Sequence, residues 1–282
     1  MASKARAGAS KRTTSRPRRA SLARRLVRAG RRLRGALCAL PMALRVVVVA
    51  VGILGAGATL NWGYQVLRKP TELFFPVSGA LTKSPSETWR TYRSLFTMHA
   101  TAAITPELLA ALAQVESAGN PVARTHWRWR PTAHPLEWYR PASSAVGMYQ
   151  ITDGTFQEAK RYCIHDHVTV EEGAWHEVRS CWFNRLYTRV LPTHAIELTA
   201  AWLDRSVAHA LASRRPATAT LPQQQDLAAV IHLCGARAGA AYAAGGFRPT
   251  AAHPRCGDHD VNHYLSRVNA LKREFARLAA AG

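Results

Sequence analysis

Residues 104–121 read ITPELLAALAQVESAGNP, and this stretch predicts a short helix that ends abruptly. Thr105 is a favoured N-cap residue, and Pro106 suits the first helical turn, where its missing N–H would have no partner. The Gly-Asn-Pro sequence at 119–121 supplies a C-cap and a helix breaker. The helix therefore ends just after Glu116, and that residue is the centre of the functional interpretation.

Glu116 lies on the apolar face of this predicted helix. It follows Leu108 and Leu112 at four-residue spacing, so the three side chains share one face. Burying a carboxylate without a partner is costly, and apolar neighbours at a helix end are expected to raise its pKa. A carboxyl group with a raised pKa suits a general acid that works near neutral pH. The alternative is a glutamate that merely extends into solvent at a helix terminus.

The formal charge of +21 is concentrated at the N-terminus. Residues 1–45 contain 14 of the 38 Lys and Arg residues and no acidic residue, which leaves 24 basic against 17 acidic residues elsewhere. We interpret residues 1–45 as a basic cytoplasmic tail that is disordered, or helical only on anionic lipid. The tail could instead bind a cytoplasmic partner or nucleic acid. The modest charge of the remainder does not indicate nucleic-acid binding by the folded domain.

An uncharged run of twenty residues, 46–65, follows the tail. This length suffices for a transmembrane helix, and Trp62 and Tyr64 occupy the position of an interfacial aromatic belt. Basic residues before the span predict a cytoplasmic N-terminus. We therefore expect a single-pass signal anchor that exports everything from about residue 66 onward. The alternatives are a buried core helix and a signal peptide cleaved near residues 56–58, which read AGA.

Four of the five cysteines lie beyond the predicted span. An oxidising compartment would let them pair, and three connectivities are possible. We favour Cys163–Cys181 and Cys234–Cys256, since each pair closes a short loop between predicted helices. A zinc site built from Cys256 and the histidines that follow it is the rival interpretation. These ligands do not form a recognised zinc pattern, so no metal is predicted.

The rest of the chain predicts helices and no convincing strands. Residues 66–99 are interpreted as a linker followed by a helix, because residues 84–87, SPSE, form a capping box. Residues 100–282 form the predicted functional domain, in which prolines make 122–141 an irregular loop rich in tryptophan and arginine. Further helices are expected at 154–163, 182–191, 194–213, 223–238 and 260–280. The sequence therefore predicts one all-α domain after one transmembrane helix.

Three segments resemble motifs of the lysozyme-like soluble lytic transglycosylase family. Residues 116–121, ESAGNP, resemble its E-S-x-x-N-P signature, and residues 145–150, AVGMYQ, are similar to its A-x-G-L-M-Q segment. Residues 262–268, NHYLSRV, resemble the segment that holds the family's active-site tyrosine. The resemblance covers roughly residues 100–275 and implies a mainly helical domain of the α+β lysozyme-like superfamily.

The resemblance implies that Glu116 protonates the glycosidic oxygen of a peptidoglycan strand. The same residue would then act as a base on the muramyl 6-hydroxyl, giving a 1,6-anhydro product without water or a cofactor. Most glycosidases need a second carboxylate, and neither Asp153 nor Glu158 has an obvious claim to that role. A mechanism in which the substrate's own N-acetyl group stabilises the anomeric centre resolves this difficulty.

The resemblance also implies substrate contacts around the acid. Ser117 would lie at the sugar-binding edge or bond the helix backbone, and Gly147 would let the backbone approach the glycan closely. Met148 and Tyr149 would line the floor of the sugar site, unless they belong to the core. Gln150 is expected to donate to an acetamido group or to the loop after the acid.

Two residues further along the chain complete the expected site. Tyr264 would hold Glu116 in place, unless it is a core aromatic. His232 occupies a position at which the family has tyrosine, within the segment 230–235 that replaces its A-Y-N-A-G motif. This histidine could take over a hydrogen bond, could alter the activity, or could be a buried core residue. Asn120 is expected to cap and brace the loop rather than to touch substrate.

The spacing of the first two motifs also departs from the family. Twenty-five residues separate Pro121 from Gly147, which is more than the family usually has. The tryptophan- and arginine-rich loop is therefore an insertion. Its tryptophans could stack on sugar rings or could simply cover the surface of the domain.

We therefore predict a membrane-anchored lytic transglycosylase that cleaves the β-1,4 bond between N-acetylmuramic acid and N-acetylglucosamine. Its tether and tail suggest recruitment to a local task, such as opening the wall for a secretion or conjugation apparatus. The alternatives are a muramidase that uses the same glutamate and a non-catalytic peptidoglycan-binding scaffold subunit. The expected partners are glycan strands, the inner membrane and possible secretion or conjugation machinery.

Overall fold

The computed structural model describes residues 27–28, 31–32, 34–36, 38–74, 77–177, 180–212, 219–248 and 255–281. The chain divides into two compact units, Met1–Trp62 and Gly63–Gly282. Most of the predicted basic tail lies outside the described residues.

Helix α2 spans Met42–Arg68 and contains the whole predicted transmembrane run. Among the described residues it is the one helix that is long and apolar enough to cross a membrane, and none of its apolar window is buried. A core helix of a folded domain would be covered by other elements. The helix is therefore compatible with an anchor or with a signal sequence, and not with the core-helix alternative.

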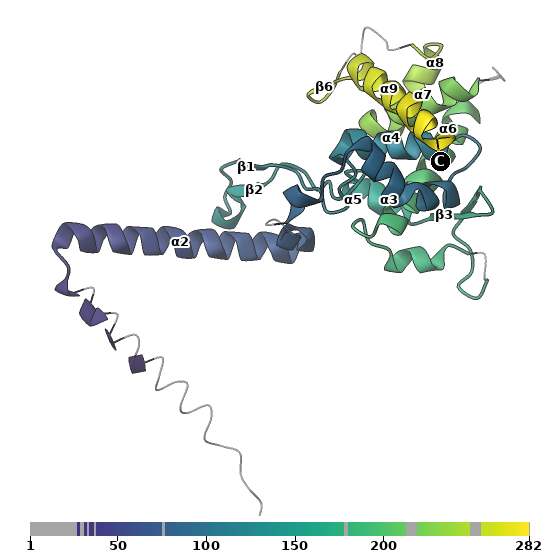
Figure 1. The fold of residues 1–282 in the computed structure, drawn as a ribbon. Coiled ribbons are helices and arrows are strands. Elements are labelled where there is room, and N and C mark those ends of the chain that lie inside the picture. Colours follow the sequence, from purple (N-terminus) through teal and green to yellow (C-terminus); the bar gives the residue numbers. More distant parts are fainter. Residues whose placement is uncertain are drawn as a thin grey trace, which may run out of the picture. The chain divides into compact units, whose positions relative to one another are not determined.

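The second unit is mostly helical, as predicted, with three small antiparallel hairpins (Figure 1). Its α-helices are α3 (Pro85–Met98), α4 (Pro106–Ser117), α5 (Asp153–Ala159), α6 (Pro192–Ala212), α7 (Leu221–Cys234), α8 (Ala236–Ala244) and α9 (Val261–Ala280). Its 3-10 helices are η1 (Pro70–Phe74), η2 (Ser78–Leu81), η3 (Pro135–Glu137) and η4 (Trp182–Leu186). The hairpins pair β1 (Trp127–Trp129) with β2 (Tyr139–Pro141), β3 (Tyr162–His165) with β4 (Val168–Glu171), and β5 (Arg255–Cys256) with β6 (His259–Asp260).

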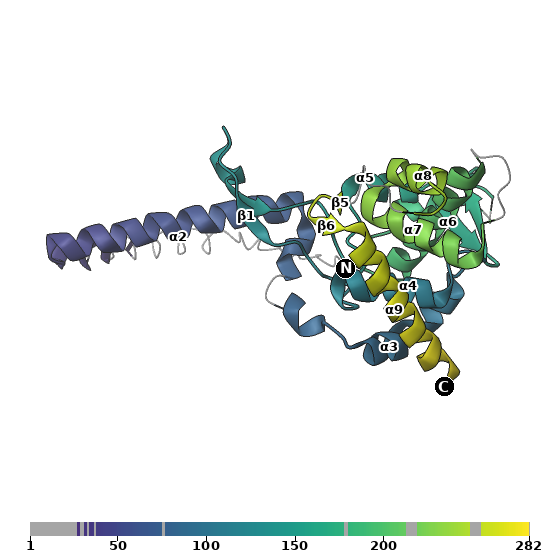
Figure 2. The ribbon, with the colours of Figure 1, turned by 90° about the horizontal axis from the view of Figure 1, so that it is seen from above.

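Helix α4 lies at the centre of this unit. Six consecutive residues, Leu108–Ala113, are buried, so neighbouring elements cover the helix on every side. It packs against α3 and α9, and Figures 1 and 2 both show α9, in yellow, beside it. A helix enclosed in this way can present functional groups only at its ends. Glu116 stands in the last turn.

The ends of α4 follow the predicted signals. The Thr105 side chain accepts a hydrogen bond from the backbone N–H of Leu108, as an N-cap does. At the other end Ala118 adopts the left-handed conformation, with φ of 53°, and its N–H bonds back to the carbonyl of Gln114. The helix thus ends at Ser117, directly after Glu116.

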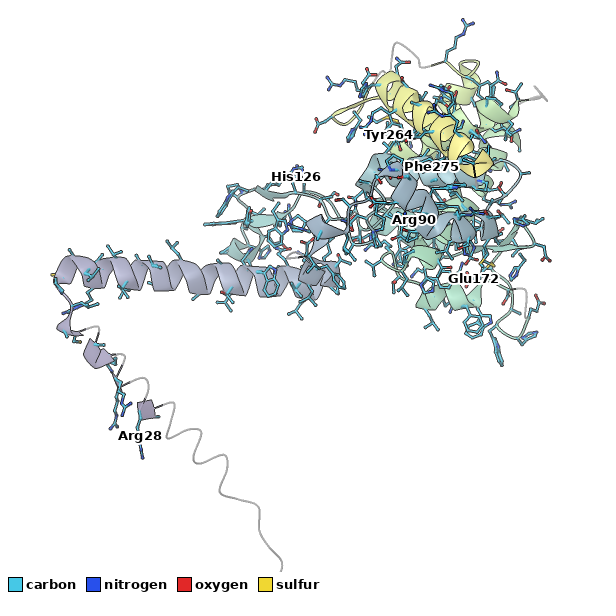
Figure 3. The ribbon with its side chains drawn as sticks, in the orientation of Figure 1. Arg28, Arg90, His126, Glu172, Tyr264 and Phe275 are labelled. Atoms are coloured by element: carbon cyan, nitrogen blue, oxygen red, sulfur yellow. A yellow bond between two sulfur atoms is a disulfide. The ribbon has the colours of Figure 1, made fainter. Side chains whose placement is uncertain are left out.

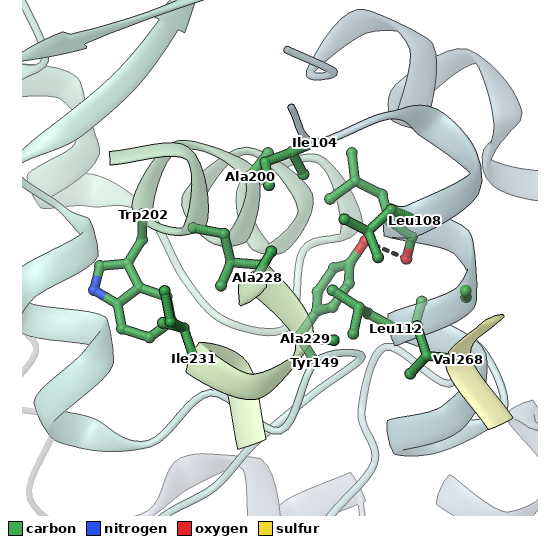
Figure 4. Packing of buried hydrophobic residues seen from close by; sticks show 14 of the residues in the cluster. Ile104, Leu108, Leu112, Tyr149, Ala200, Trp202, Ala228, Ala229, Ile231 and Val268 are labelled. Carbon is green, nitrogen blue, oxygen red and sulfur yellow. Dashed lines mark hydrogen bonds between the residues drawn. The ribbon is translucent and has the colours of Figure 1, made fainter. Parts of the chain in front are cut away.

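On one side of α4 the core includes aliphatic side chains and Tyr149. Leu108 and Leu112 of α4 face Ala228 and Ala229 of α7, and all four side chains are fully buried (Figure 4). Tyr149 lies among them, and its hydroxyl donates to the backbone carbonyl of Leu109 at 3.1 Å. This packing fixes the 147–150 turn against the middle of α4.

The structure contains strands where the sequence predicts other elements. The β1–β2 hairpin lies within the expected loop 122–141, and β3 begins at Tyr162, where the helix predicted at 154–163 should still continue. Helix α5 ends at Ala159 instead. Strands of three or four residues are too short for alternation of polar and apolar residues to identify them, so the prediction without strands is wrong in these segments.

Two predicted helices also differ from the observed ones. The segment 182–191 forms only the 3-10 helix η4, which ends at Leu186. The helix predicted at 223–238 is divided at Gly235, whose φ of 84° is not helical, into α7 and α8. The predicted helices 194–213 and 260–280 correspond to α6 and α9.

Both disulfides are the pairs favoured from the sequence. Cys163–Cys181 joins β3 to the residue before η4, and Cys234–Cys256 joins the end of α7 to β5. Because Cys256 is bonded to another sulfur, it offers no thiolate to a metal, and the zinc interpretation is wrong. Cys38 is free and exposed.

Candidate active site

Two side chains converge on one oxygen of Glu116. The Tyr264 hydroxyl donates to Oε1 at 2.6 Å, and His232 Nε2 lies 3.5 Å from the same atom. The Glu116 side chain is 18% exposed and that of His232 is 9% exposed. Among the described residues, none hydrogen-bonds the other carboxylate oxygen, Oε2, which is therefore the oxygen available to a ligand.

Three helices far apart in the sequence supply these groups. Glu116 stands at the end of α4 and His232 in the last turn of α7. Tyr264 stands in the first turn of α9 and is labelled in Figure 3. The disulfide Cys234–Cys256 ties α7, two residues after His232, to β5 just before α9. This disulfide therefore links the two segments that carry the partners of Glu116.

The pKa of Glu116 lies below its ordinary value in the empty site. Burial raises the pKa, but the hydrogen bond and electrostatic interaction with His232 and the hydrogen bond from Tyr264 together outweigh burial. The electrostatic interaction with His259 acts in the same direction. The expectation of a raised pKa is therefore wrong here. Burial does raise the pKa of Glu116, but polar partners from helices distant in sequence lower it by more, so the net shift is downward.

Tyr264 is a permanent donor to this carboxylate. It is 6% exposed, and burial, together with the negative charge and hydrogen bond of Glu116, holds the pKa of its hydroxyl well above the ordinary value. The phenol thus stays protonated across the physiological pH range. Its orientation on α9 fixes which oxygen of Glu116 faces away from the protein.

Within the part of the chain that the structure describes, the groups that act most strongly on the pKa of Glu116 are histidines and a tyrosine, and none of them is an acid. Asp153, one of the acids near the second motif, instead forms an ion pair with Arg189 at 2.7 Å and is itself 68% exposed. Glu116 is therefore the acidic residue around which the chemistry of this site is built.

Ser117 bonds the protein backbone. Its Oγ lies 2.8 Å from the carbonyl oxygen of Met148 and 3.1 Å from that of Ala113, and it accepts the N–H of Asn120 at 3.2 Å. These contacts correspond to the backbone-bonding alternative for this serine. They join the end of α4 to the 147–150 turn and so position the residue next to it, Glu116.

Gly147 is required by a contact within the protein. Its φ is 80°, and an added Cβ would lie 2.2 Å from the carbonyl oxygen of Arg189. The close approach predicted for a glycan is therefore made by the Arg189 backbone. The Arg189 side chain also donates to the carbonyls of Ser144 and Ile151, so it braces this turn from both sides. No sequence signal marks Arg189 for that role.

Gln150 completes the same turn. It adopts a left-handed backbone with φ of 47°, an uncommon conformation outside glycine. Its Nε2 donates to the carbonyls of Gly147 at 2.9 Å and Ala123 at 3.3 Å. Of the two roles expected for Gln150, the contact to the loop after Glu116 is the one that the structure forms.

Met148 and Tyr149 do not line a sugar site. Both side chains are completely buried in the core, so they cannot touch a substrate. The expectation fails because an apolar residue of a motif can pack in the core beneath a site as well as line its surface. Asn120 behaves as expected: it is 3% exposed, accepts the N–H of Val122 and donates to the carbonyl of Ser78.

A cavity opens beside His232. It encloses about 340 Å³ of empty space, including the solvent at its mouth, and it also borders on Gln150, Thr199 and Trp202. The Thr199 hydroxyl and the Trp202 indole N–H are buried and have no hydrogen-bond partner among the described residues. Neither α6 residue is identifiable from the sequence, because each occupies a position typical of a buried helix face.

Residues 95–219 match the family model of the transglycosylase SLT domain. No curated protein and no solved structure matches the chain. The match includes Glu116, Ser117 and the 147–150 turn, and it ends before His232 and Tyr264. It agrees with the mostly helical, lysozyme-like fold, and an SLT domain implies lytic transglycosylase-like activity on peptidoglycan in general terms.

Proposed function

We propose that this protein is a lytic transglycosylase that cleaves the β-1,4 bond between N-acetylmuramic acid and N-acetylglucosamine and forms a 1,6-anhydro end. The single observation that carries the proposal is the Glu116 carboxylate. It is half-buried at the end of α4, and Tyr264 and His232 hold one of its oxygens. The match of residues 95–219 to the SLT domain supports the substrate class.

In the first step Glu116 acts as an acid. Because Oε1 accepts the Tyr264 hydrogen bond, the acidic proton resides on Oε2. A glycan strand laid over the site excludes water from the carboxyl group, and this added burial raises the pKa of Glu116 from its low value in the empty site. The proton then passes to the glycosidic oxygen as the C1–O4 bond breaks.

In the second step the same carboxylate acts as a base. The substrate's N-acetyl group stabilises the anomeric carbon after the bond breaks, which a site with a single carboxylate requires. The 6-hydroxyl of that sugar forms a new bond to C1 and gives its proton to Glu116. The carboxyl group returns to its starting state, and no water is consumed.

The cavity beside His232 fits the recognition of an N-acetyl group. Such a group presents a carbonyl oxygen and a methyl group. The residues that border the cavity include the apolar Ile151 and Leu198, which suit the methyl group, and the polar Gln150 and Thr199, which suit the carbonyl oxygen.

The proposed reaction is tested by mass spectrometry of the products released from purified sacculi. Anhydromuropeptides from the wild type, absent with Glu116→Gln, would support both the reaction and the acid. Reducing muramic acid ends would favour the muramidase alternative. Binding to sacculi without any product would favour the scaffold alternative.

We further propose that α2 is an uncleaved anchor in a bacterial inner membrane, with the N-terminus in the cytoplasm and the catalytic unit in the periplasm. Its length and composition support a span, and the 14 basic residues before it favour this orientation. Protease added outside intact spheroplasts should digest the catalytic unit and spare an epitope at the N-terminus. The reverse pattern would invert the topology, and loss of the epitope from the mature chain would indicate cleavage.

We propose that the basic tail recruits the enzyme to a local task, such as opening the wall for a secretion or conjugation apparatus. The separation of a basic segment from the catalytic unit by an anchor supports this idea. Deleting residues 1–45 should disperse the enzyme and impair the apparatus. Unchanged localisation and function after that deletion would contradict the proposal.

A further inference from the structure

The hairpin of residues 127–141 separates aromatic from basic side chains. In its antiparallel register Trp129 pairs with Tyr139, and Arg128 pairs with Arg140. Successive residues of a strand point to opposite faces, so one face carries the rings and the other carries the arginines. The Trp129 and Tyr139 ring centroids are 5.1 Å apart.

Much of this hairpin is presented to solvent. Trp129 is 71% exposed and Trp138 is 44% exposed, although tryptophan is usually one of the more buried residue types. Arg128 is exposed as well, whereas Arg140 opposite it forms an ion pair with Glu137 at 3.2 Å. Exposed indoles beside an exposed arginine indicate a surface that binds an anionic, partly apolar partner.

The hairpin is attached to the last turn of α2. At its η3 turn the backbone carbonyl of Leu136 accepts a hydrogen bond from Gln65, which is 5% exposed. The Glu137 carboxylate accepts from the Tyr64 hydroxyl at 3.3 Å and forms an ion pair with Arg68.

A second connection lies one turn further along the chain. The Trp127 indole N–H donates at 2.9 Å to Glu72 of η1, a carboxylate that is fully buried and also contacts Lys69 and Arg124. The hairpin is therefore fixed to the residues that immediately follow the apolar run.

These attachments determine the depth of the hairpin if α2 spans a membrane. Twenty helical residues, 46–65, rise about 30 Å at roughly 1.5 Å per residue. That length equals the thickness of the hydrocarbon core, about 30 Å. Tyr64 and Gln65 then lie at the edge of the hydrocarbon, and Arg68 lies among the headgroups. The η3 turn, which bonds all three residues, lies at the same level.

We propose that the 127–141 hairpin enters the headgroup layer of the phospholipid surface on the side where α2 ends. Its ring face, with Trp129, then lies toward the hydrocarbon, and Arg128 on the opposite face contacts the surrounding lipid phosphates. Tryptophan and tyrosine favour that layer, and each basic residue near an anionic surface adds attraction. The inference rests on the proposed anchoring by α2. The hairpin would then be a second membrane attachment in addition to α2, and it would hold the catalytic unit close to the bilayer.

A glycan strand is the competing ligand, because aromatic rings also stack on sugars. The observed attachments favour the lipid surface, since they bind the hairpin to the end of the apolar helix. The exposed Arg128 likewise favours a dense layer of phosphates over an uncharged sugar ring.

The experiment uses the full chain in vesicles of phosphatidylethanolamine and phosphatidylglycerol that contain lipids brominated near the headgroup, which quench nearby tryptophans. Trp129→Phe is compared with Trp175→Phe, a matched control because Trp175 is 78% exposed and follows β4. We expect the quenched fraction of the emission to fall in Trp129→Phe, because a quenched tryptophan is lost. We expect it to rise in Trp175→Phe. A rise or no change in Trp129→Phe would overturn the inference.

The anionic lipid contact is tested in the same vesicles. In the wild type, Trp129 quenching should be stronger in vesicles that contain phosphatidylglycerol than in vesicles without it, and Arg128→Gln should reduce this difference. The control is Arg90→Gln, on the exposed surface of α3 (Figure 3), which should leave the difference unchanged. Equal effects of the two substitutions would overturn the role of Arg128. If lipids do not quench Trp129 but glycan fragments change its emission, the hairpin binds sugar rather than lipid.

Vesicle flotation in alkaline carbonate separates the two proposals. A chain that does not float with the vesicles would overturn both the anchor and the hairpin contact. A chain that floats while Trp129 escapes quenching would leave the anchor intact and overturn only the inference about the hairpin.

Discussion

At Glu116, burial and polar contacts act on the same carboxyl group in opposite directions. Burial favours the protonated form that an acid catalyst needs, whereas His232 and Tyr264 favour the carboxylate. Both partners contact Oε1, so they restrain the carboxylate while Oε2 stays available. The empty site therefore favours an ionised glutamate. In the proposed mechanism the acid forms when a substrate covers it.

Replacing His232 with leucine should shift the pH dependence of the reaction. The substitution removes a hydrogen bond and an electrostatic interaction that lower the pKa of Glu116, while burial, which raises it, remains. The pKa of Glu116 therefore rises, and the protonated acid persists to higher pH. The alkaline limb of the kcat/KM profile should move upward in pH. His259→Leu removes an electrostatic interaction that affects the Glu116 pKa less, so it should move the limb less. An unmoved limb in His232→Leu would refute this account of the Glu116–His232 pair.

Tyr264→Phe should lower the rate without unfolding the protein. It removes the 2.6 Å hydrogen bond to Oε1 and leaves the ring in place. A hydrogen bond to a charged group contributes about 1.5–3 kcal/mol, which corresponds to a loss of roughly ten- to hundredfold in kcat/KM. Tyr242→Phe, at an equally buried tyrosine of α8, is the control and should retain the wild-type rate. Equal rates for the two variants would show that the Tyr264 contact has no part in the reaction.

At the scale of elements, the 147–150 turn is built around the backbone of Arg189. Gly147→Ala would place a methyl group 2.2 Å from a carbonyl oxygen at a φ of 80°, so we expect a destabilisation of roughly 1–3 kcal/mol. Gly154→Ala, in α5 with open space around its Cβ, should instead stabilise by about 0.4–1 kcal/mol. Urea unfolding of both variants measures the difference. Similar free energies of unfolding would mean that Arg189 does not constrain the turn.

The two disulfides should differ in their effect on activity more than on stability. They close loops with sequence separations of 22 and 18 residues, so removing either should cost about 3 kcal/mol by loss of loop constraint. Only Cys234–Cys256 joins the segments that carry His232 and Tyr264. Replacing both cysteines of that pair with alanine should therefore lower kcat more than the same change at Cys163–Cys181, when the two variants are equally stable. Equal losses would indicate a purely structural role for both.

The elements predictable from sequence are those with strong local signals. The Thr105 N-cap and the abrupt end of α4 follow from cap and breaker chemistry, and the disulfide pairs follow from short loops. The β3–β4 hairpin and the break at Gly235 do not, because strands of four residues and one glycine in a helix-like run resemble ordinary helical sequence. Tertiary packing decides those positions.

The site was predictable only in part for a similar reason. Glu116 is apparent from its own helix, and Tyr264 was expected beside it through resemblance to a family motif. The sign of the Glu116 pKa shift depends on His232, which is 116 residues away in sequence, and could not be read from the local stretch. The buried Met148 and Tyr149 show that proximity in a motif does not separate residues that touch a ligand from residues that support it.

At the scale of the whole molecule, the functions are arranged along the chain. The basic tail and the apolar helix come first, then the segment that matches the SLT domain and supplies the acid, and last the helices α7 and α9 that supply its partners. A truncation after residue 219 would keep Glu116 and lose both His232 and Tyr264. We therefore predict that a chain truncated at that boundary is inactive on peptidoglycan.

The most direct test of the central claim is digestion of purified sacculi in water enriched in oxygen-18, followed by mass spectrometry. If Glu116 acts first as acid and then as base, the wild type releases 1,6-anhydro products without the label, and Glu116→Gln loses roughly a hundred- to ten-thousandfold in rate. Products that carry one oxygen-18 at a reducing end, or a Glu116→Gln variant as active as the wild type, would contradict the claim.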